Sequence, residues 1–252
     1  MKKTGKDRLI EHIQIKSYKK DATYSYTLGA FPTYELILNK PKLVQKVLMH
    51  SGYTDGDSLQ VLCAKQDIPI EVNDKLIGKI SDKENCYVAG IFDKYSCDLS
   101  MDKPHIVLVN PSNMGNLGTI LRTIVGFGIY NIAIIFPGAD IFNPKTVRAS
   151  MGALFKLNFQ HYSSFDEYRK HFESHDVFTF MINKEHTMNI KDCPKSKLFS
   201  LVFGNEATGL DDSFLNVGTS VMIPQSPDVD SLNLTIAVGI GAYAFTGGAM
   251  GG

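Results

Sequence analysis

The sequence predicts an α/β protein whose C-terminal part is a parallel sheet with helices on both faces, preceded by a smaller α/β unit. Two observations lead to this fold class. Short apolar runs alternate with helical patterns from His105 onwards, and such alternation favours a mainly parallel sheet. A shorter series of the same kind precedes a polar stretch at 97–104. At 252 residues, 44% of them hydrophobic, the chain is long enough for two modest globular domains.

The N-terminal part divides into a basic segment and a small unit. Residues 1–23 are rich in lysine, which is typical either of a solvated helix and linker or of a basic arm that contacts phosphates. Residues 24–96 are predicted to form the small α/β unit, and residues 97–104 the linker that follows it. The expected elements are a strand at 24–29, a helix at 30–39, a strand or short helix at 42–51, a helix and then a strand within 58–72, and a strand at 86–95.

The C-terminal part, 105–246, carries the longer alternation. Strands are expected at 106–109, 131–136, 155–159, 177–182, 198–203 and 220–223, and helices at 117–128, 165–173 and 232–245. In such sheets ligands bind beyond the carboxyl ends of the strands, and three loops of that type are notable here. The Gly-rich end, 247–252, is expected to be a disordered tail.

Charge and cysteine content exclude several classes of protein. Basic and acidic residues balance at 26 each, which does not exclude nucleic acid, because patches matter more than totals. The four cysteines form no Cys-x-x-Cys pair, so neither a zinc site nor a disulfide framework is expected, and no metal is predicted. The N-terminus lacks the features of a signal peptide and no apolar run has membrane-spanning length, so we expect a cytoplasmic protein without a membrane partner.

The first loop, "NPSNMGNLGTILRT", contains two consecutive Asn-x-Gly triplets before a helix. Its residues suit tight turns, and amides at a helix N-terminus suit anions, but Gly-Lys-Ser/Thr and Gly-x-Gly-x-x-Gly are both missing. A nucleotide-phosphate loop and a nicotinamide-dependent oxidoreductase therefore receive little support. Arg122 is either a surface residue or a guanidinium that binds a phosphate or ribose oxygen.

The second and third loops follow apolar strands. In "FGNEATGL", Phe203 to Leu210, a carboxylate comes directly after a buried strand, where it must be hydrogen-bonded or used. Glu206 or Thr208 could instead cap a following helix. In the third loop, Ile223-Pro224 leads to Ser231-Leu232-Asn233. Ser231 is the expected N-cap of an apolar helix, which should be buried in the domain or at a subunit interface.

In this order the three loops resemble the motifs of the SpoU (TrmH) family of SPOUT RNA methyltransferases. Those motifs run Asn-Pro-x-Asn-x-Gly-x-x-x-Arg, then Gly-x-Glu-x-x-Gly-Leu, then Ile-Pro and Ser-Leu-Asn before an apolar helix. The resemblance also covers "VRASMGALF" between the first two motifs, and residues 24–96 resemble a ribosomal-protein-L30e-like RNA-binding domain. It implies a deep trefoil knot, bound S-adenosylmethionine, a homodimer, and methyl transfer to a ribose 2′-hydroxyl of structured RNA, with ribosomal RNA favoured over transfer RNA.

The resemblance also assigns roles to residues of this sequence. Arg122 would orient the ribose and stabilise developing charge, and it would act together with Asn116, Glu206, Ser231 and Asn233 as the catalytic set. The cofactor pocket would be formed by Phe203, Gly204, Asn205, Glu206, Gly209, Leu210, Ile223, Pro224, Ser231, Leu232 and Asn233.

This sequence departs from the family pattern in the first and third motifs. The first motif has three extra residues, so either Asn113 or Asn116 can be the motif asparagine, but not both. We choose Asn116, because its six-residue spacing to Arg122 would keep both at the helix start. Pro227 stands where the family usually has Gly, which would stiffen the cofactor loop. A non-catalytic RNA-binding protein of the same fold is the alternative function.

Overall fold

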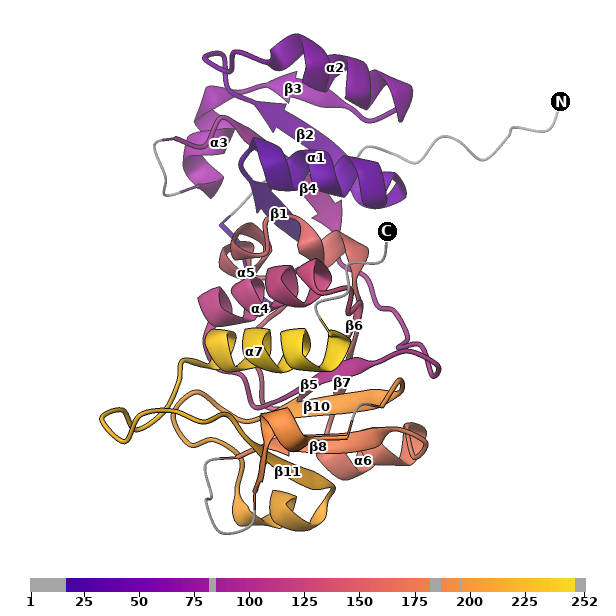
Figure 1. Cartoon of the computed structure of the whole chain (residues 1–252). Coiled ribbons are helices and arrows are strands. Elements are labelled where there is room, and N and C mark those ends of the chain that lie inside the picture. Colours follow the sequence, from indigo (N-terminus) through magenta and orange to yellow (C-terminus); the bar gives the residue numbers. More distant parts are fainter. Residues whose placement is uncertain (1–16, 82–84, 182–186, 195, 248–252) are drawn as a thin grey trace, which may run out of the picture.

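The computed structural model describes residues 17–81, 85–181, 187–194 and 196–247, and it contains two sheets (Figure 1). A four-stranded sheet with the order β1-β4-β2-β3 lies in the N-terminal part, and a seven-stranded sheet with the order β7-β6-β5-β10-β8-β11-β9 lies in the C-terminal part. The basic segment before Ser17 and the Gly-rich end after Gly247 lie outside the described residues. Among the helices described, none is long and apolar enough to cross a membrane.

The N-terminal unit has the elements that the sequence predicts, and two more, the 3₁₀ helix η1 and helix α3. Its strands are β1 (Tyr24–Leu28), β2 (Val44–Met49), β3 (Ile70–Val72) and β4 (Val88–Asp93), and its helices are α1 (Ala30–Asn39), η1 (Pro41–Leu43), α2 (Gly56–Lys65) and α3 (Asp74–Ile80). The strand alternative at 42–51 is confirmed. Helix α3 was not predicted, because seven residues are too few for a clear periodic pattern.

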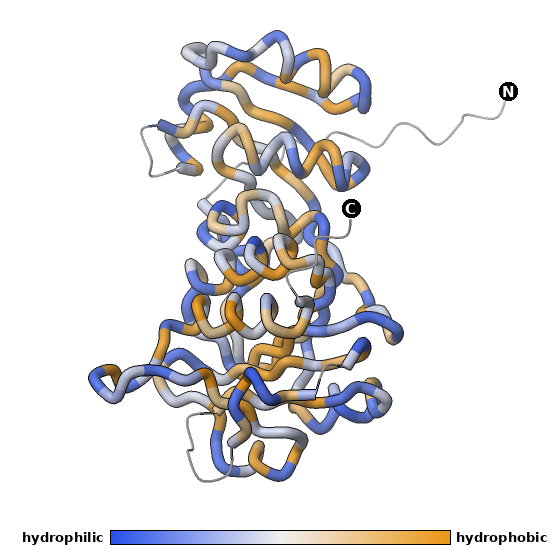
Figure 2. The backbone as a smooth tube through the Cα atoms, in the orientation of Figure 1, coloured by the Kyte–Doolittle hydropathy of each residue, from blue (hydrophilic) through white to orange (hydrophobic). Residues whose placement is uncertain are grey.

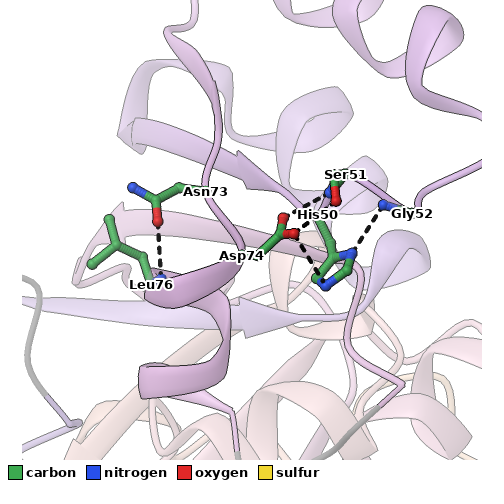
Figure 3. A network of polar contacts seen from close by, with 6 residues as sticks. All are labelled: His50, Ser51, Gly52, Asn73, Asp74 and Leu76. Atoms are coloured by element: carbon green, nitrogen blue, oxygen red, sulfur yellow. Dashed lines mark hydrogen bonds and ion pairs between the residues drawn. The ribbon is translucent and has the colours of Figure 1, made fainter.

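A polar network joins the loop after β2 to the start of α3 (Figure 3). The Asp74 carboxylate accepts hydrogen bonds from the backbone N–H of Ser51 at 2.8 Å and from its hydroxyl at 2.7 Å. His50 Nε2 lies 3.6 Å from the same carboxylate, and its Nδ1 accepts from Gly52 N–H at 2.9 Å. Asn73 caps the helix by accepting from Leu76 N–H. These contacts fix an exposed loop against a short helix.

The larger sheet is parallel throughout the strand pairs described. Its strands are β5 (His105–Val109), β6 (Asn131–Ile135), β7 (Asn158–Tyr162), β8 (Asp176–Phe180), β9 (Met188–Asn189), β10 (Phe199–Phe203) and β11 (Thr219–Met222). Helices α4 (Met114–Gly126), α5 (Pro144–Ala149) and α7 (Leu234–Thr246) lie between this sheet and the N-terminal unit, while α6 (Phe165–His171) covers the other face (Figure 1).

Each face of the larger sheet buries its own apolar core. On one face, Leu121 and Ile124 of α4 pack with Val238 of α7. On the other, Tyr168 of α6 packs with Val107 of β5. The strands are largely hydrophobic along their length, whereas the loop between β11 and α7 that extends from the body is mostly hydrophilic (Figure 2). Buried parallel strands have this character, so the predicted fold class is confirmed. The knot stays a prediction.

Three sequence expectations in this part were wrong in detail. The strand expected at 155–159 lies at Asn158–Tyr162, because residues 153–156 form a 3₁₀ helix, η2, in which Phe155 is buried. The helix expected at 117–128 begins at Met114, since the Asn113 side chain accepts from Asn116 N–H and caps it there. Helix α5 was missed because its six residues give no clear helical period.

The N-terminal unit packs directly on the helices of the larger sheet. Leu36 of α1 and Phe92 of β4 belong to the same apolar core as α4 and α7. Lys156 Nζ lies 2.7 Å from the Glu35 carboxylate across the contact. The predicted linker, 97–104, also runs along the larger sheet, where Ser100 N–H donates to Asn131 Oδ1 at 3.0 Å. Packing and hydrogen bonds therefore restrain the two units relative to each other.

The amino edge of the larger sheet holds a buried polar cluster. Tyr168 OH lies 2.9 Å from His105 Nδ1 and 2.6 Å from Ser200 Oγ, and His175 Nδ1 lies 2.9 Å from the same Ser200 Oγ. Burial lowers the pKa of His105 to about 4. The side chains therefore satisfy one another as a neutral network in the interior.

Candidate active site

A cavity of about 390 Å³ lies at the carboxyl ends of β8, β10 and β11. This volume falls within the usual range for small-molecule sites, and the position is where parallel α/β sheets bind ligands. Ten of the predicted cofactor residues line it: Phe203, Gly204, Asn205, Glu206, Gly209, Leu210, Ile223, Pro224, Ser231 and Leu232.

The second loop folds back on itself to form one wall of the cavity. Gly209 N–H donates to Asn205 O at 2.9 Å, and the Asn205 side chain accepts from Ala207 N–H at 2.8 Å. A Cβ at Gly204 would lie 2.1 Å from the Gly209 carbonyl carbon, so only glycine allows this close return. The helix-cap interpretation of Glu206 or Thr208 was wrong, because the turn is closed by Asn205 and the next 3₁₀ helix is capped by Asp211.

Glu206 joins the second loop to the first. One carboxylate oxygen accepts from Ser112 N–H at 3.0 Å and from Ser112 Oγ at 2.8 Å. The other accepts from Asn113 N–H at 3.1 Å and from Asn116 Nδ2 at 3.3 Å. We call Glu206, Ser112, Asn113 and Asn116 the Glu206 cluster. It holds two loops, more than 90 residues apart in sequence, in one fixed arrangement beside the cavity.

Opposing effects act on the charge of Glu206. Burial raises its pKa, but the hydrogen bonds from Ser112, from the Glu206 amide and from Asn113 lower it, and the pKa lies below its ordinary value. The carboxylate is therefore ionised at neutral pH. A fixed negative charge at the rim of an otherwise largely apolar cavity favours a ligand that carries positive charge nearby.

The two asparagines of the first loop have different positions. Asn113 is the N-cap of α4, and its side chain is used within its own helix. The Asn116 side chain instead reaches the Glu206 carboxylate. Of the two asparagines, only Asn116 therefore makes a side-chain contact across the loops. Its assignment as the motif asparagine stays a prediction.

Arg122 lies apart from the cavity within one chain. It follows Met114 by eight residues, which places it about 12 Å along α4. The expectation that Asn116 and Arg122 share the helix start was therefore wrong, because six residues separate them by about 9 Å along the axis. The Arg122 side chain is exposed, and among the described residues it forms no hydrogen bond or ion pair. Its guanidinium is available to a ligand or a second chain.

The third loop lines the cavity through Ser231 and Leu232, and Asn233 performs a different task. Asn233 is the N-cap of α7, where its side chain accepts from Thr235 N–H at 2.8 Å and from Thr235 Oγ1 at 2.7 Å. The expectation that Ser231 caps this helix was wrong. Asn233, Asn116 and Arg122 are not among the residues that line the cavity.

The inner end of the cavity is apolar, and the sequence did not assign most of it. The rings of Phe180 and Phe203 stack with centroids 4.3 Å apart. Helix α7 approaches them closely because Gly241 has no side chain, since a Cβ there would lie 2.9 Å from Phe180 Cζ. The unpredicted lining residues are Phe180, Met181, Ala207, Thr208, Val221, Met222, Gln225, Leu234 and Ala237. Phe180 ends β8 and Met181 follows it, so the rule that ligands bind at carboxyl ends could have located them.

The residues that the structure describes include no group of three or more His, Cys, Asp or Glu arranged to hold a metal ion. The features that remain are a parallel sheet, an apolar cavity at its carboxyl edge, and a carboxylate that joins two loops there. Together they define the class as a ligand-binding α/β domain with the binding site at the carboxyl edge.

The family follows from the comparison with known proteins. Residues 103–243 match the sequence model of the SpoU rRNA Methylase family, which is more than half of the chain, and the chain belongs to that family. The chain is 32% identical over 139 residues to an uncharacterised tRNA/rRNA methyltransferase of Synechocystis, with 55% of this chain and 51% of the relative covered. It is 28% identical over 134 residues to the Bacillus subtilis 23S rRNA (guanosine(2553)-2′-O)-methyltransferase RlmP, with 53% and 54% covered. It thus spans about half the length of these curated relatives.

Solved structures share the fold over most of the chain. An AdoMet-bound rRNA methyltransferase from Sinorhizobium meliloti has a TM-score of 0.76 at 24% identity, and the match covers 90% of this chain and 88% of that one. The SpoU methyltransferase AviRb from Streptomyces viridochromogenes, in complex with AdoMet, has a TM-score of 0.78 at 19% identity, with 91% and 92% covered. Both matches cover far more than the larger sheet alone, so the likeness of fold includes the N-terminal unit.

Proposed function

We propose that this protein transfers a methyl group from S-adenosylmethionine to a ribose 2′-hydroxyl of structured RNA. The observation that carries the proposal is the cavity at the carboxyl edge, where the Glu206 cluster joins the two loops that hold the first two motifs. The family to which the chain belongs is consistent with this reaction.

The residues present fit S-adenosylmethionine. Its adenine suits the apolar wall made by Phe203, Leu234 and Ala237, and the folded second loop offers backbone groups for its polar edges. Its sulfonium suits a site with an ionised carboxylate at the rim. When bound, the cofactor would supply a methyl group on positively charged sulfur, which is a good leaving group. No metal is required for that chemistry.

In this proposal the protein contributes mainly by positioning. Glu206 fixes the first loop through Ser112, Asn113 and Asn116, and alignment of the reacting atoms provides most of the rate. Arg122 orients the ribose and stabilises the charge that develops on its oxygen. Ser231 and Asn233 order the third loop, by lining the cavity and by capping α7 respectively.

A homodimer would bring Arg122 to the site. Helix α7 exposes Ile236 by 53% and Tyr243 by 59%, and Phe127, directly after α4, lies against Tyr243 with ring centroids 5.9 Å apart. An apolar helix with large exposed side chains is typical of a subunit contact. We propose that a second chain packs on α7 and α4, so that its Arg122 reaches the first chain's cavity.

Ribosomal RNA is the substrate that we favour, and transfer RNA is the alternative. Bacillus RlmP is named for 23S rRNA, whereas a Listeria relative, 30% identical over 142 residues, is named as a putative tRNA (cytidine(34)-2′-O)-methyltransferase. The match covers 84% of that relative's length, which leaves little room in it for a second unit, whereas this chain has one. We propose that the N-terminal unit is an L30e-like RNA-binding domain and that the protein acts in the cytoplasm, where ribosomes are assembled.

The test is methyl transfer by the purified full chain. The protein is incubated with tritiated S-adenosylmethionine and RNA from cells that lack it. Tritium should enter the RNA at one position, and the RNA should resist alkaline cleavage there, because a 2′-O-methyl group blocks that cleavage. Arg122→Ala and Asn233→Ala should lower the rate by about 10²-fold or more with the fold intact. A purified protein that binds no S-adenosylmethionine would refute the proposal. Binding of RNA without transfer would instead favour the non-catalytic RNA-binding alternative.

A further inference from the structure

A pair of stacked rings, one exposed and one half-buried, lies at the same edge of the larger sheet as the cavity. Phe136 directly follows β6 and is 49% exposed. Its ring stacks on His161 of β7 with centroids 5.0 Å apart and planes at 20°. Phe159 contacts the His161 ring edge-on, with centroids 6.3 Å apart. The imidazole is therefore supported from within, and the phenyl ring presents a flat apolar surface to solvent.

Backbone hydrogen bonds connect this pair to the first loop. Phe136 N–H donates to Tyr162 O at 2.9 Å, and Asn110 N–H donates to Ile135 O at 3.0 Å. Ala139 N–H donates to Pro111 O at 2.6 Å, which joins the loop after β6 to the first loop. The ring pair, the first loop and the cavity therefore follow one another along the edge in the strand order β7, β6, β5, β10.

Charged groups of both signs lie near the rings. Lys94 Nζ donates to Lys20 O at 2.7 Å and lies 4.8 Å from the centre of the Tyr18 ring. The charges of Asp140 and of the exposed Lys20 both act on the His161 imidazole, that of Asp140 more strongly, and Asp140 also accepts a hydrogen bond from Tyr18 OH. The sequence that leads to Lys20 has seven basic residues and two acidic ones over positions 1–20. This composition suits a polyanion.

We propose that Phe136 and His161 form a stacking site for an unpaired base of the RNA substrate, next to the ribose that is methylated. The inference rests on the proposed function and extends it to a residue that the family motifs do not include. Proteins recognise single-stranded RNA by stacking its bases on aromatic side chains beside a basic surface. A single exposed phenylalanine needs no explanation, but a ring stack at the same sheet edge as the cavity, with the exposed Lys20 near it, matches that mode of recognition.

The test uses the full chain with Phe136→Ala and Phe136→Trp, and Tyr130→Ala as the matched control. Tyr130 is 47% exposed at the opposite end of β6, so its removal takes away a similar exposed ring at the amino edge. The probes are a single-stranded oligoribonucleotide with one 2-aminopurine, the same base inside a hairpin stem, and RNA from cells that lack the protein. The measurements are fluorescence quenching, KM and kcat for RNA, Kd for S-adenosylmethionine, and thermal stability.

We expect Phe136→Ala to raise Kd for the single-stranded probe and KM for RNA between about fivefold and a hundredfold, as for the loss of one stacked base. Phe136→Trp should keep both values, and Tyr130→Ala should change neither. Cofactor Kd and thermal stability should stay constant in all three variants. Equal effects of Phe136→Ala and Tyr130→Ala, or tighter binding of the stem than of the single strand, would overturn the inference.

The outcomes separate this inference from the proposed function. Methyl transfer that is unchanged in Phe136→Ala leaves the function standing and removes the stacking site. Phe136-dependent RNA binding without any transfer leaves the stacking site and removes the function. A chain that neither binds the probes nor methylates RNA overturns both.

Discussion

Two carboxylates in this molecule are held by a serine in nearly the same way. Asp74, at the start of α3, accepts from the N–H and the hydroxyl of Ser51 at 2.8 and 2.7 Å. Glu206, after β10, accepts from the N–H and the hydroxyl of Ser112 at 3.0 and 2.8 Å. In both places the hydrogen bonds lower the pKa of the carboxyl and burial opposes them, and at Glu206 burial is the largest single effect.

The surroundings of the two carboxylates differ. Asp74 lies on an open surface with His50 as its third partner, and it joins segments 23 residues apart. Glu206 borders a cavity of about 390 Å³, accepts from the Asn116 side chain, and joins loops 94 residues apart. The comparison teaches that a hydrogen-bonded carboxylate is not by itself a functional signal. The adjacent cavity and the long-range connection distinguish the candidate site.

The largest contrast is expected when each carboxylate is removed. Glu206→Ala frees the first loop, and a displacement of about 1 Å lowers methyl transfer by about a hundredfold. Asp74→Ala should change the rate of methyl transfer by less than about twofold, because the Ser51 loop that Asp74 holds belongs to the N-terminal unit. The measurement is kcat/KM for RNA in both variants and the wild type. Equal losses in the two variants would show that the comparison is mistaken.

A smaller contrast is expected from the serines. Ser112→Ala removes one hydroxyl hydrogen bond to an ionised carboxylate and keeps the backbone N–H bond, so transfer should fall by about tenfold. Ser51→Ala makes the same change at Asp74 and should leave transfer as it is. Both rates are measured under saturating cofactor. A Ser112→Ala enzyme with the full wild-type rate would contradict the role given to the Glu206 cluster.

The two asparagines of the first loop should separate stability from activity. Asn113→Ala removes the N-cap of α4 and should lower the free energy of unfolding by about 1 kcal/mol. Asn116→Ala should act mainly on the rate of methyl transfer and less on the free energy of unfolding, since it breaks the contact to Glu206. Urea unfolding and transfer rates are measured together. Full activity in Asn116→Ala with loss in Asn113→Ala would reverse our choice of motif asparagine.

The smallest effect is expected from pH. The folded-state pKa of Glu206 is lowered from a usual value of 4.5, so its ionised form stabilises the fold above that value. This contribution is lost as pH falls through the lowered folded-state pKa. The stability difference between wild type and Glu206→Gln should be constant from pH 8 to about 5 and shrink below about 4.5. Urea unfolding at each pH measures it, and a difference that grew on acidification would contradict the sign.

Most of the fold could be predicted from the sequence, because alternating apolar runs define parallel strands and the helices between them. The elements missed were α3, α5 and β9, which are too short to show a period. The predicted starts of two helices were wrong where more than one residue could serve as the N-cap. Asn233 rather than Ser231 begins α7, and Asn113 begins α4 a turn early, because caps depend on local dihedral angles that composition does not specify.

The candidate site was predicted in part. The second- and third-loop residues that line the cavity could be assigned because their motifs are contiguous in sequence. The contact of Glu206 with Ser112 could not, since it joins residues 94 apart through backbone geometry. Phe180 and Met181 were missed because apolar residues at a strand end look like ordinary core.

The most direct test of the central claim is a map of 2′-O-methyl positions in ribosomal and transfer RNA. Cells that lack the protein are compared with cells that express the wild type, Glu206→Ala or Asp74→Ala. We predict that one ribose position loses its methyl group, and that wild type and Asp74→Ala restore it while Glu206→Ala does not. An unchanged map, or restoration by Glu206→Ala, would contradict the account.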